Sequence, residues 1–258
     1  MLTVDLHLLL QKFNKYTFVE DTHTYYCNGY PVSISVTTFI QRYFPKFDFD
    51  NISIKYANKH NLDVEDVRAN WRKTGTIAST AGTIVHSHIE NLKRGKDFKP
   101  DFTEAKKLDI YDEVKERVEI LLPKANKFHK DTLNKLYPLG LEYTVGVDTK
   151  LAGNIDMLCW NDEAKEIQIW DYKNTKGIET YSSYNNRCYE PFDMYDDCSF
   201  IHYSMQLNFY KAIIEQELGL AVGKMYLVSF DYSQLNDSYT VYECVDLQSI
   251  CKKELSNL

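Results

Sequence analysis

The segment from Gly153 to Lys176 combines the pattern of a β-hairpin with charged residues that strands seldom contain. Aspartate is disfavoured inside strands, yet Asp156 falls in the middle of the first arm, and Asp171 and Lys173 fall in the second. Because side chains alternate between the two faces of a strand, Asp171 and Lys173 share one face. Two carboxylates and an ammonium group in one hairpin indicate a site that could hold a divalent cation through oxygen ligands.

The expected strand register brings a third carboxylate to the same patch. If residues 162–165 form the hairpin loop, Asp156 lies opposite Asp171. If residues 148–150 join the preceding strand to this hairpin, Glu142 lies opposite Asp156. Like charges directly opposite each other destabilise a sheet, so a bound cation would explain the row. An acid and a lysine two residues apart also arise by chance at this composition, so the hairpin alone leaves a purely structural reading open.

Two helical segments carry further polar pairs. "GTIVHSHIE" places His86 and Glu90 four residues apart, and "QLNFY" does the same for Gln206 and Tyr210. Residues at positions i and i+4 lie on the same face of a helix. Each pair taken alone is also typical of an ordinary packed or solvent-facing helix. The order of these pairs along the chain, on either side of the charged hairpin, makes them informative together.

The elements expected around these residues form a mixed α/β domain. The Asn28-Gly29 pair predicts a β-hairpin turn within residues 16–36. Residues 177–200 lack periodicity and are predicted to form a long loop. Helices are predicted over 50–73, over 74–95, over 103–135 with an interruption near Pro123, and over 200–220. Strands are predicted over 139–147, 151–160, 166–174, 224–232 and 239–247.

In chain order, G-x-x-x-H-x-x-I-E, G-x-I-D, D-Y-K and Q-x-x-x-Y resemble the motifs of the RecB-type branch of the PD-(D/E)XK nuclease superfamily. This resemblance covers residues 71–232. The sequence also resembles mitochondrial genome maintenance exonuclease and small nucleases of phages and large DNA viruses. The resemblance implies a restriction-endonuclease-like core with a central mixed β-sheet flanked by helices. It places this nuclease core at 71–258, including the long loop 177–200, with an N-terminal extension of a hairpin and helices at 1–70.

The resemblance also implies a role for each matching residue. The implied metal ligands are His86, Asp156, Asp171 and the backbone carbonyl of Tyr172. They would hold one or two Mg²⁺ or Mn²⁺ ions for hydrolysis of a phosphodiester bond. The implied catalytic residues are Asp156, Asp171 and Lys173, with Glu90 and Glu142 ranked lower because their positions are often acidic in relatives.

Contacts with nucleic acid are expected from three groups of residues. Gln206 and Tyr210 match positions that support the site or touch the nucleic acid in relatives. Tyr184 and Tyr189 lie in the loop that follows Lys173, where exposed rings would stack on unpaired bases. The same rings could equally anchor the loop. The basic residues expected to bind phosphates beside the His86 helix are Arg72, Lys73 and Lys93.

Charge, cysteine spacing and hydropathy limit which cofactors, binding modes and cellular locations are expected. A formal net charge of −7 argues against binding nucleic acid by overall charge, so a local basic groove is needed. The six cysteines lack the clustered spacing of an iron–sulfur site, and no G-x-x-x-x-G-K-[ST] loop is present, so neither an iron–sulfur cluster nor a nucleotide cofactor is expected. Without a basic leader or a long apolar run, we expect no membrane association or secretion and a cytoplasmic location, in the host cytoplasm if the protein is viral or from a phage.

The leading hypothesis is a metal-dependent DNA nuclease, most simply an exonuclease on single-stranded ends in DNA repair, recombination or viral replication. Replication or recombination proteins are the expected protein partners. Two alternatives stay open at this level. One is a structure-specific endonuclease with the same metal site. The other is a catalytically silent protein on a nuclease fold that binds nucleic acid or a partner, such as an inhibitor of host defence.

Overall fold

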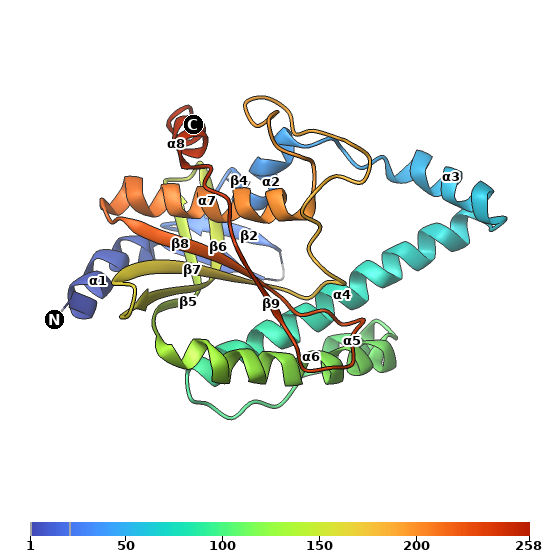
Figure 1. Cartoon of the computed structure of the whole chain (residues 1–258), viewed down its shortest axis with the longest axis horizontal. Coiled ribbons are helices and arrows are strands. Elements are labelled where there is room, and N and C mark those ends of the chain that lie inside the picture. Colours follow the sequence, from blue (N-terminus) through green and yellow to red (C-terminus); the bar gives the residue numbers. More distant parts are fainter. Residues whose placement is uncertain (1, 21) are drawn as a thin grey trace.

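The computed structural model describes residues 2–20 and 22–258, and its centre is a six-stranded mixed sheet with helices on both faces (Figure 1). The strands are β4 (Ile34–Ser35), β5 (Leu136–Val147), β6 (Leu151–Asn161), β7 (Glu166–Lys173), β8 (Val222–Ser229) and β9 (Thr240–Glu243). They follow the order β4-β6-β7-β8-β9, and β5 pairs with the other edge of β6. The β4–β6 and β7–β8 pairs are parallel, and the other pairs are antiparallel. This confirms the predicted mixed α/β core.

Helices cover the two faces of the sheet unequally. α7 (Ser199–Leu218) lies across one face, and α4 (Val64–Lys93) and α6 (Tyr111–Asp131) lie together on the other (Figure 1). On the α7 side, Leu207 and Phe209 are buried in a core that includes Ile155 and Ile169 of the sheet. On the other side, Val85 and Phe128 pack in a separate core with Met157 and Trp170. Adjacent residues such as Ile169 and Trp170 of β7, or Met157 and Leu158 of β6, thus enter different cores, as expected for a sheet buried on both faces.

The N-terminal part adds a small sheet and short helices. Its elements are α1 (Leu2–Leu10), β1 (Tyr16–Val19), β2 (Thr24–Cys27), β3 (Tyr30–Pro31), α2 (Val36–Ile40) and α3 (Phe49–His60). β2 pairs with both β1 and β3. The Asn28-Gly29 turn therefore joins β2 to the two-residue strand β3. Cys27 lies opposite Tyr30 across this turn, which confirms the predicted hairpin. A second hairpin forms where β1 pairs with β2, with Val19 opposite Thr24.

Two helices depart from the expected boundaries. α6 continues through Pro123 without interruption because Val118, Leu121 and Ala125 on either side of it are buried, and this packing outweighs the lost backbone hydrogen bond. The helical segments expected over 50–73 and 74–95 divide at 61–63 and not at residue 74, because α4 begins at Val64, where Asp63 accepts the backbone N–H groups of Glu65 and Asp66. The division into residues 1–70 and 71–258 falls inside this helix and stays a prediction.

The remaining elements complete the frame. α5 (Thr103–Lys107) precedes α6, and α8 (Gln248–Ser256) packs against α7. Short 3₁₀ turns occupy Gln11–Lys15, Gln41–Tyr43 and Leu133–Lys135. Between β7 and α7 the described chain forms no helix or strand apart from a single bridge between Arg187 and Asp196, which agrees with the predicted long loop.

No helix in the described ranges is both long and apolar enough to span a lipid bilayer.

The strand register agrees with the sequence-based expectation. Residues 148–150 and 162–165 are the two connections, and the β5–β6 ladder pairs Leu141 with Met157. Glu142 and Asp156 are therefore neighbours across β5 and β6. The β6–β7 ladder pairs Met157 with Trp170 and stops there.

The edge of β6 that faces away from β5 is shared between two strands. It pairs with β4 at Leu151 and Ala152, and with β7 from Met157 onward. Residues 153–156 have no strand partner on this edge in the described chain. The ring of Tyr210 packs over the face of the sheet at Gly153, where a Cβ atom on this glycine would lie 2.6 Å from a ring carbon. Only glycine leaves room for the ring, which explains the first residue of the G-x-I-D motif.

Candidate active site

Side chains from β5, β6 and α4 meet beside the opening in the sheet. The Nδ1 atom of His86 lies 3.7 Å from Oε1 of Glu142 and 3.6 Å from Oδ2 of Asp156. One potential ligand atom from each residue lies within 4.8 Å of the other two. An imidazole with two carboxylates is a donor set that suits Mn²⁺ and tolerates Mg²⁺. These three residues could therefore hold one divalent cation.

Each of these side chains is oriented by a second contact. Nε2 of His86 lies 3.0 Å from the carbonyl oxygen of Tyr172, so it donates to this oxygen when Nδ1 faces the carboxylates. Oδ2 of Asp156 accepts the backbone N–H of Tyr172 at 2.7 Å. The Tyr172 carbonyl thus holds the histidine from the side of the ring opposite the carboxylates, and its predicted metal ligation stays a prediction.

Glu142 adopts an unusual backbone conformation. Its φ is 48°, in the left-handed region that residues other than glycine rarely occupy. Its Oε2 accepts the side-chain amide of Asn154 at 2.6 Å, which directs Oε1 toward His86. Backbone strain of this kind is concentrated at functional sites. Glu142, which the sequence ranked below the main motifs, therefore belongs to the centre of the candidate metal site.

The D-Y-K motif forms an ion pair at the end of β7. Nζ of Lys173 lies 2.7 Å from Oδ2 of Asp171, and the side chains are 20% and 5% exposed. The ammonium also lies 4.6 Å from the ring centroid of Tyr203 on α7, a cation–π contact. Asp171 is thus engaged by Lys173 and does not belong to the three-residue group of possible ligands. Its predicted role as a ligand stays a prediction.

Burial and crowding shift the pKa values of these groups. Burial lowers the pKa of His86, but the carboxylates of Asp156 and Glu142 outweigh it and raise the pKa to about 9. Burial raises the pKa of Asp171 to about 6 despite the nearby Lys173 ammonium. Burial also raises the pKa of Asp156, against the opposing effect of His86. A metal cation would stabilise the ionised carboxylates and would compete with the proton on His86.

We therefore expect metal binding to release close to one proton at pH 7.5, where His86 is protonated in the metal-free protein. The apparent affinity for Mn²⁺ should rise up to about tenfold per pH unit and level off near pH 9. Calorimetric titration with MnCl₂ in two buffers of different ionisation enthalpy measures the released proton. A His86→Gln variant should lose the release, and equal release by this variant would contradict the assignment.

Gln206 and Tyr210 support the site from α7. Nε2 of Gln206 donates to the Tyr210 hydroxyl at 2.8 Å, and the Tyr210 ring packs on Gly153. The structure thus brings this pair to the face of the sheet at Gly153. Glu90 is placed differently, because its carboxylate is bound by the Arg94 side chain at 2.8 Å one turn further along α4. Glu90 is not brought into the group around His86.

The three predicted phosphate-binding residues have dissimilar surroundings. Lys93 donates to two backbone carbonyls, those of Leu133 and Leu136, and burial lowers its pKa. Lys73 pairs with Glu113 at 2.5 Å. Arg72 lies over the ring of Phe49, 5.4 Å from its centroid, and has no carboxylate partner in the described chain. Of the three, Arg72 is the most available for a phosphate.

The aromatic residues of the long loop differ in how deeply they are buried. Phe192 is fully buried and packs edge-on against Tyr43, so it anchors the loop to the core. Tyr184 and Tyr189 are 86% and 53% exposed. Their rings remain free for the predicted stacking on bases, which stays a prediction.

Two residues that orient the site were not identified from the sequence. Asn154 lies within the G-x-I-D motif itself, at the variable position, and directs Glu142. Tyr203 precedes Gln206 by three residues, so both lie on one face of α7, and this spacing was the available signal.

A comparison with family models matches residues 54–251 to the PD-(D/E)XK nuclease superfamily. The chain belongs to this superfamily. The matched region contains every residue of the His86, Glu142 and Asp156 group and the Asp171–Lys173 pair. Membership confirms the predicted superfamily and implies a nuclease that uses divalent metal ions and binds nucleic acid. The more specific similarity to mitochondrial and phage nucleases stays a prediction.

A solved structure titled "Crystal structure of SSO0001" is similar at 14% sequence identity and a TM-score of 0.32, covering 100% of this chain and 85% of that chain. No curated protein shows significant sequence similarity to this chain.

Proposed function

We propose that this superfamily member is a metal-dependent deoxyribonuclease that degrades single-stranded DNA from its ends, in repair, recombination or viral replication. One observation carries the proposal. His86, Glu142 and Asp156 lie close enough together for one cation to contact all three, beside the Asp171–Lys173 ion pair. A silent binding protein would have no need for crowded, buried carboxylates of raised pKa or for a strained Glu142.

The candidate ligands suit Mn²⁺ or Mg²⁺, one or two ions, because they combine an imidazole with several carboxylates. A bound cation would lower the pKa of attacking water and offset charge that develops at phosphorus. His86 and Asp156 are held in place by the Tyr172 backbone, so the donor atoms need little rearrangement for binding.

Lys173 provides the positive group for the substrate. Burial lowers its pKa, but the Asp171 and Asp156 carboxylates outweigh this and raise it, so the amine is charged at neutral pH. It is the more exposed partner of the ion pair, and Tyr203 and Asp171 fix its position. From there the ammonium would orient the attacking water and donate to non-bridging phosphate oxygens as their charge increases.

The preference for single strands is inferred from the loop after β7. Tyr184 and Tyr189 are exposed in the segment that begins directly after Lys173. Stacking of bases on such rings is independent of sequence and requires unpaired bases. A loop that covers the site would admit a strand through its free end and hinder a duplex.

The test is to incubate the protein with end-labelled linear single strands, blunt duplex and closed single-stranded circles, each with Mn²⁺, Mg²⁺ or EDTA. We expect rapid metal-dependent degradation of linear single strands, slow degradation of duplex, and intact circles. Activity should fall steeply with salt because only local cations offset the net charge of −7. Efficient cutting of circles would make the protein an endonuclease, and no cutting of any substrate would refute the proposed function.

A further inference from the structure

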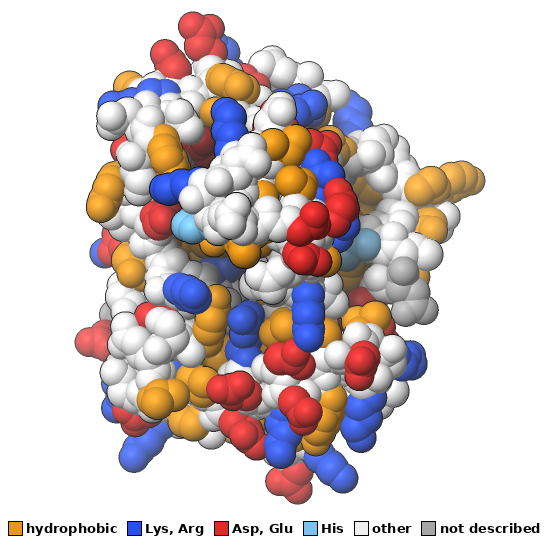
Figure 2. Space-filling model, turned by 90° about the vertical axis from the view of Figure 1, so that its right-hand side faces the viewer, with side chains coloured by type: hydrophobic (Ala, Val, Ile, Leu, Met, Phe, Trp, Pro, Cys, Tyr) orange, Lys and Arg blue, Asp and Glu red, His pale blue; other side chains and the backbone are white. Residues whose placement is uncertain are grey.

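A helical arm projects from the body of the protein (Figure 1). It comprises residues 46–73, namely α3, the connection at 61–63 and the first turns of α4. Asn61 ends α3 in the left-handed conformation, and Asp63 begins α4 two residues later. Figure 2 looks onto the end of the molecule from which the arm projects, and shows hydrophobic side chains there among both signs of charge.

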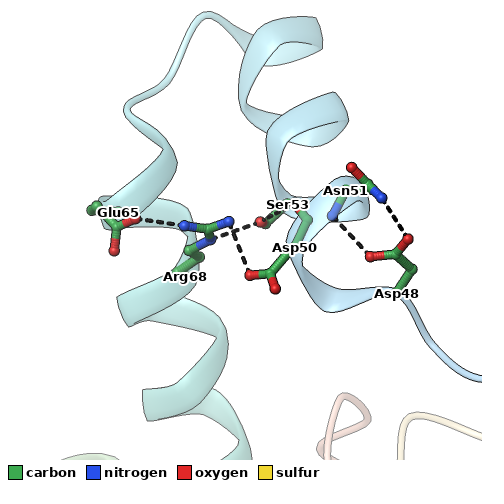
Figure 3. A network of polar contacts seen from close by, with 6 residues as sticks. All are labelled: Asp48, Asp50, Asn51, Ser53, Glu65 and Arg68. Carbon is green, nitrogen blue, oxygen red and sulfur yellow. Dashed lines mark hydrogen bonds and ion pairs between the residues drawn. The ribbon is translucent and has the colours of Figure 1, made fainter.

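The two helices of the arm are fixed to each other by one arginine (Figure 3). Arg68 of α4 donates to Ser53 at 3.0 Å and pairs with Asp50 at 3.0 Å, both on α3, and it also pairs with Glu65 at 2.6 Å. Asp48 caps α3 by accepting the N–H of Asn51. The arm is therefore a defined structure on which side chains can be held in fixed positions.

Aromatic rings cluster around Trp71 on this arm. The rings of Phe47, Phe49 and Tyr56 have their centroids 6.3, 5.8 and 5.5 Å from that of Trp71. Phe47 is 66% exposed and Tyr56 is 42% exposed. The cluster is thus a partly exposed surface of adjoining rings, and the Arg72 guanidinium lies over the ring of Phe49 at its side.

Most acidic residues of the arm are already paired or cap a helix, whereas most of its basic residues have no carboxylate partner in the described chain. Four of the five acidic residues of the arm are occupied by helix caps or by Arg68, namely Asp48, Asp50, Asp63 and Glu65. The basic residues without a carboxylate within ion-pair distance in the described chain are Lys46, Lys55, Lys59 and Arg72. The arm therefore offers free positive charge beside exposed rings, which is the combination that binds single-stranded nucleic acid.

α4 connects this surface directly to the active site. Arg72, Ser79 and His86 follow one another at intervals of seven residues, so they lie along one face of the helix. Fourteen residues of helix correspond to about 21 Å, the length of about six stacked nucleotides.

We propose that the aromatic cluster of the arm stacks on unpaired bases of the DNA strand whose scissile phosphate lies at His86. This inference rests on the proposed nuclease function and adds a second contact to it, about six nucleotides from the reaction. The contact holds the substrate without touching the reacting atoms. It therefore increases affinity for strands long enough to span the distance and leaves shorter strands unaffected.

The test compares wild type with a Phe47→Ala/Tyr56→Ala variant, using oligothymidylates of 4 and 16 nucleotides. Fluorescence anisotropy in EDTA should show about tenfold or more weaker binding of the 16-mer by the variant, and equal binding of the 4-mer. The matched control is Leu62→Ala, which removes another exposed apolar side chain of the arm, 54% exposed, outside the cluster. This control should bind both oligonucleotides like wild type.

A direct readout uses Trp71. Binding of the 16-mer should quench part of the tryptophan emission, and a Trp71→Phe variant should lack this part. Binding of the 16-mer by Phe47→Ala/Tyr56→Ala within twofold of wild type, or unchanged quenching in Trp71→Phe, would overturn the proposal and leave the surface to a protein partner. Cleavage of the 4-mer with Mn²⁺ tests the proposed function separately, because the 4-mer does not reach the arm.

Discussion

Replacing Asp156 with asparagine is expected to abolish metal-dependent cleavage while the fold is retained. The amide oxygen can still accept the backbone N–H of Tyr172, which now binds Oδ2 at 2.7 Å. The negative charge that completes the ligand group with His86 and Glu142 is lost. We expect a fall in kcat greater than the roughly 10²–10³-fold that follows removal of one transition-state donor.

Initial rates on labelled single-stranded DNA with Mn²⁺ measure this effect, and thermal melting with and without Mn²⁺ measures the site directly. Wild type should melt at a higher temperature with Mn²⁺ because the ion binds only the folded state. Asp156→Asn should melt normally without metal and gain little from it. Asp162→Asn, an exposed aspartate in the loop of the same hairpin, should behave as wild type in both assays. Near wild-type turnover by Asp156→Asn would refute the metal site.

Replacing Lys173 with methionine is expected to lower kcat by about 10²–10³-fold without loss of metal binding. The substitution removes the ammonium that we propose contacts the substrate, and it leaves the His86, Glu142 and Asp156 group complete. It also removes the cation that lowers the pKa of Asp171, which is already raised to about 6 by burial. Asp171 should therefore ionise only at higher pH, and the residual activity of the variant should require a higher pH than that of wild type.

The pH–rate profile separates this role from a merely structural one. A variant that is only less stable would lose amplitude without a shift of its acid limb. Lys224→Met is the matched control, because Lys224 is an exposed lysine of the neighbouring strand β8 that pairs with Glu243 at 2.8 Å. An acid limb of Lys173→Met that coincides with wild type would show that Lys173 does not govern the ionisation of Asp171.

The candidate metal site and the proposed DNA-binding surface differ in how their residues are spaced along the chain. Glu142, Asp156 and Asp171 lie on three strands that are consecutive in the chain and are joined by loops of three and four residues. The positions of these residues relative to one another are therefore determined by two short loops. The arm is joined to the same site by a single continuous helix, α4, in which Arg72 and His86 are separated by two intervals of seven residues. A rigid helix thus fixes the distance between the chemistry and the proposed contact with the strand.

Much of the site was predictable because it depends on local rules. The period-two alternation of strands placed Lys173 beside Asp171, and two short loops fixed the register that sets Glu142 against Asp156. The helical spacing of His86 and Glu90 likewise predicted a helix. It could not show that Glu90 is bound by Arg94, since every i, i+4 pair on an exposed face has the same pattern.

Other features depend on which distant segments pack together, and no local pattern encodes that. The sequence by itself determined the mixed α/β core, the order of motifs and the row of carboxylates. Only the tertiary structure decided that β4 and β7 share one edge of β6, that the Tyr210 ring packs on Gly153, and that Glu142 and Asp156 meet at His86. The register of a hairpin is set locally, by the few residues of its loop. The approach of α4 and α7 to the sheet is set by the fit of two separate hydrophobic cores.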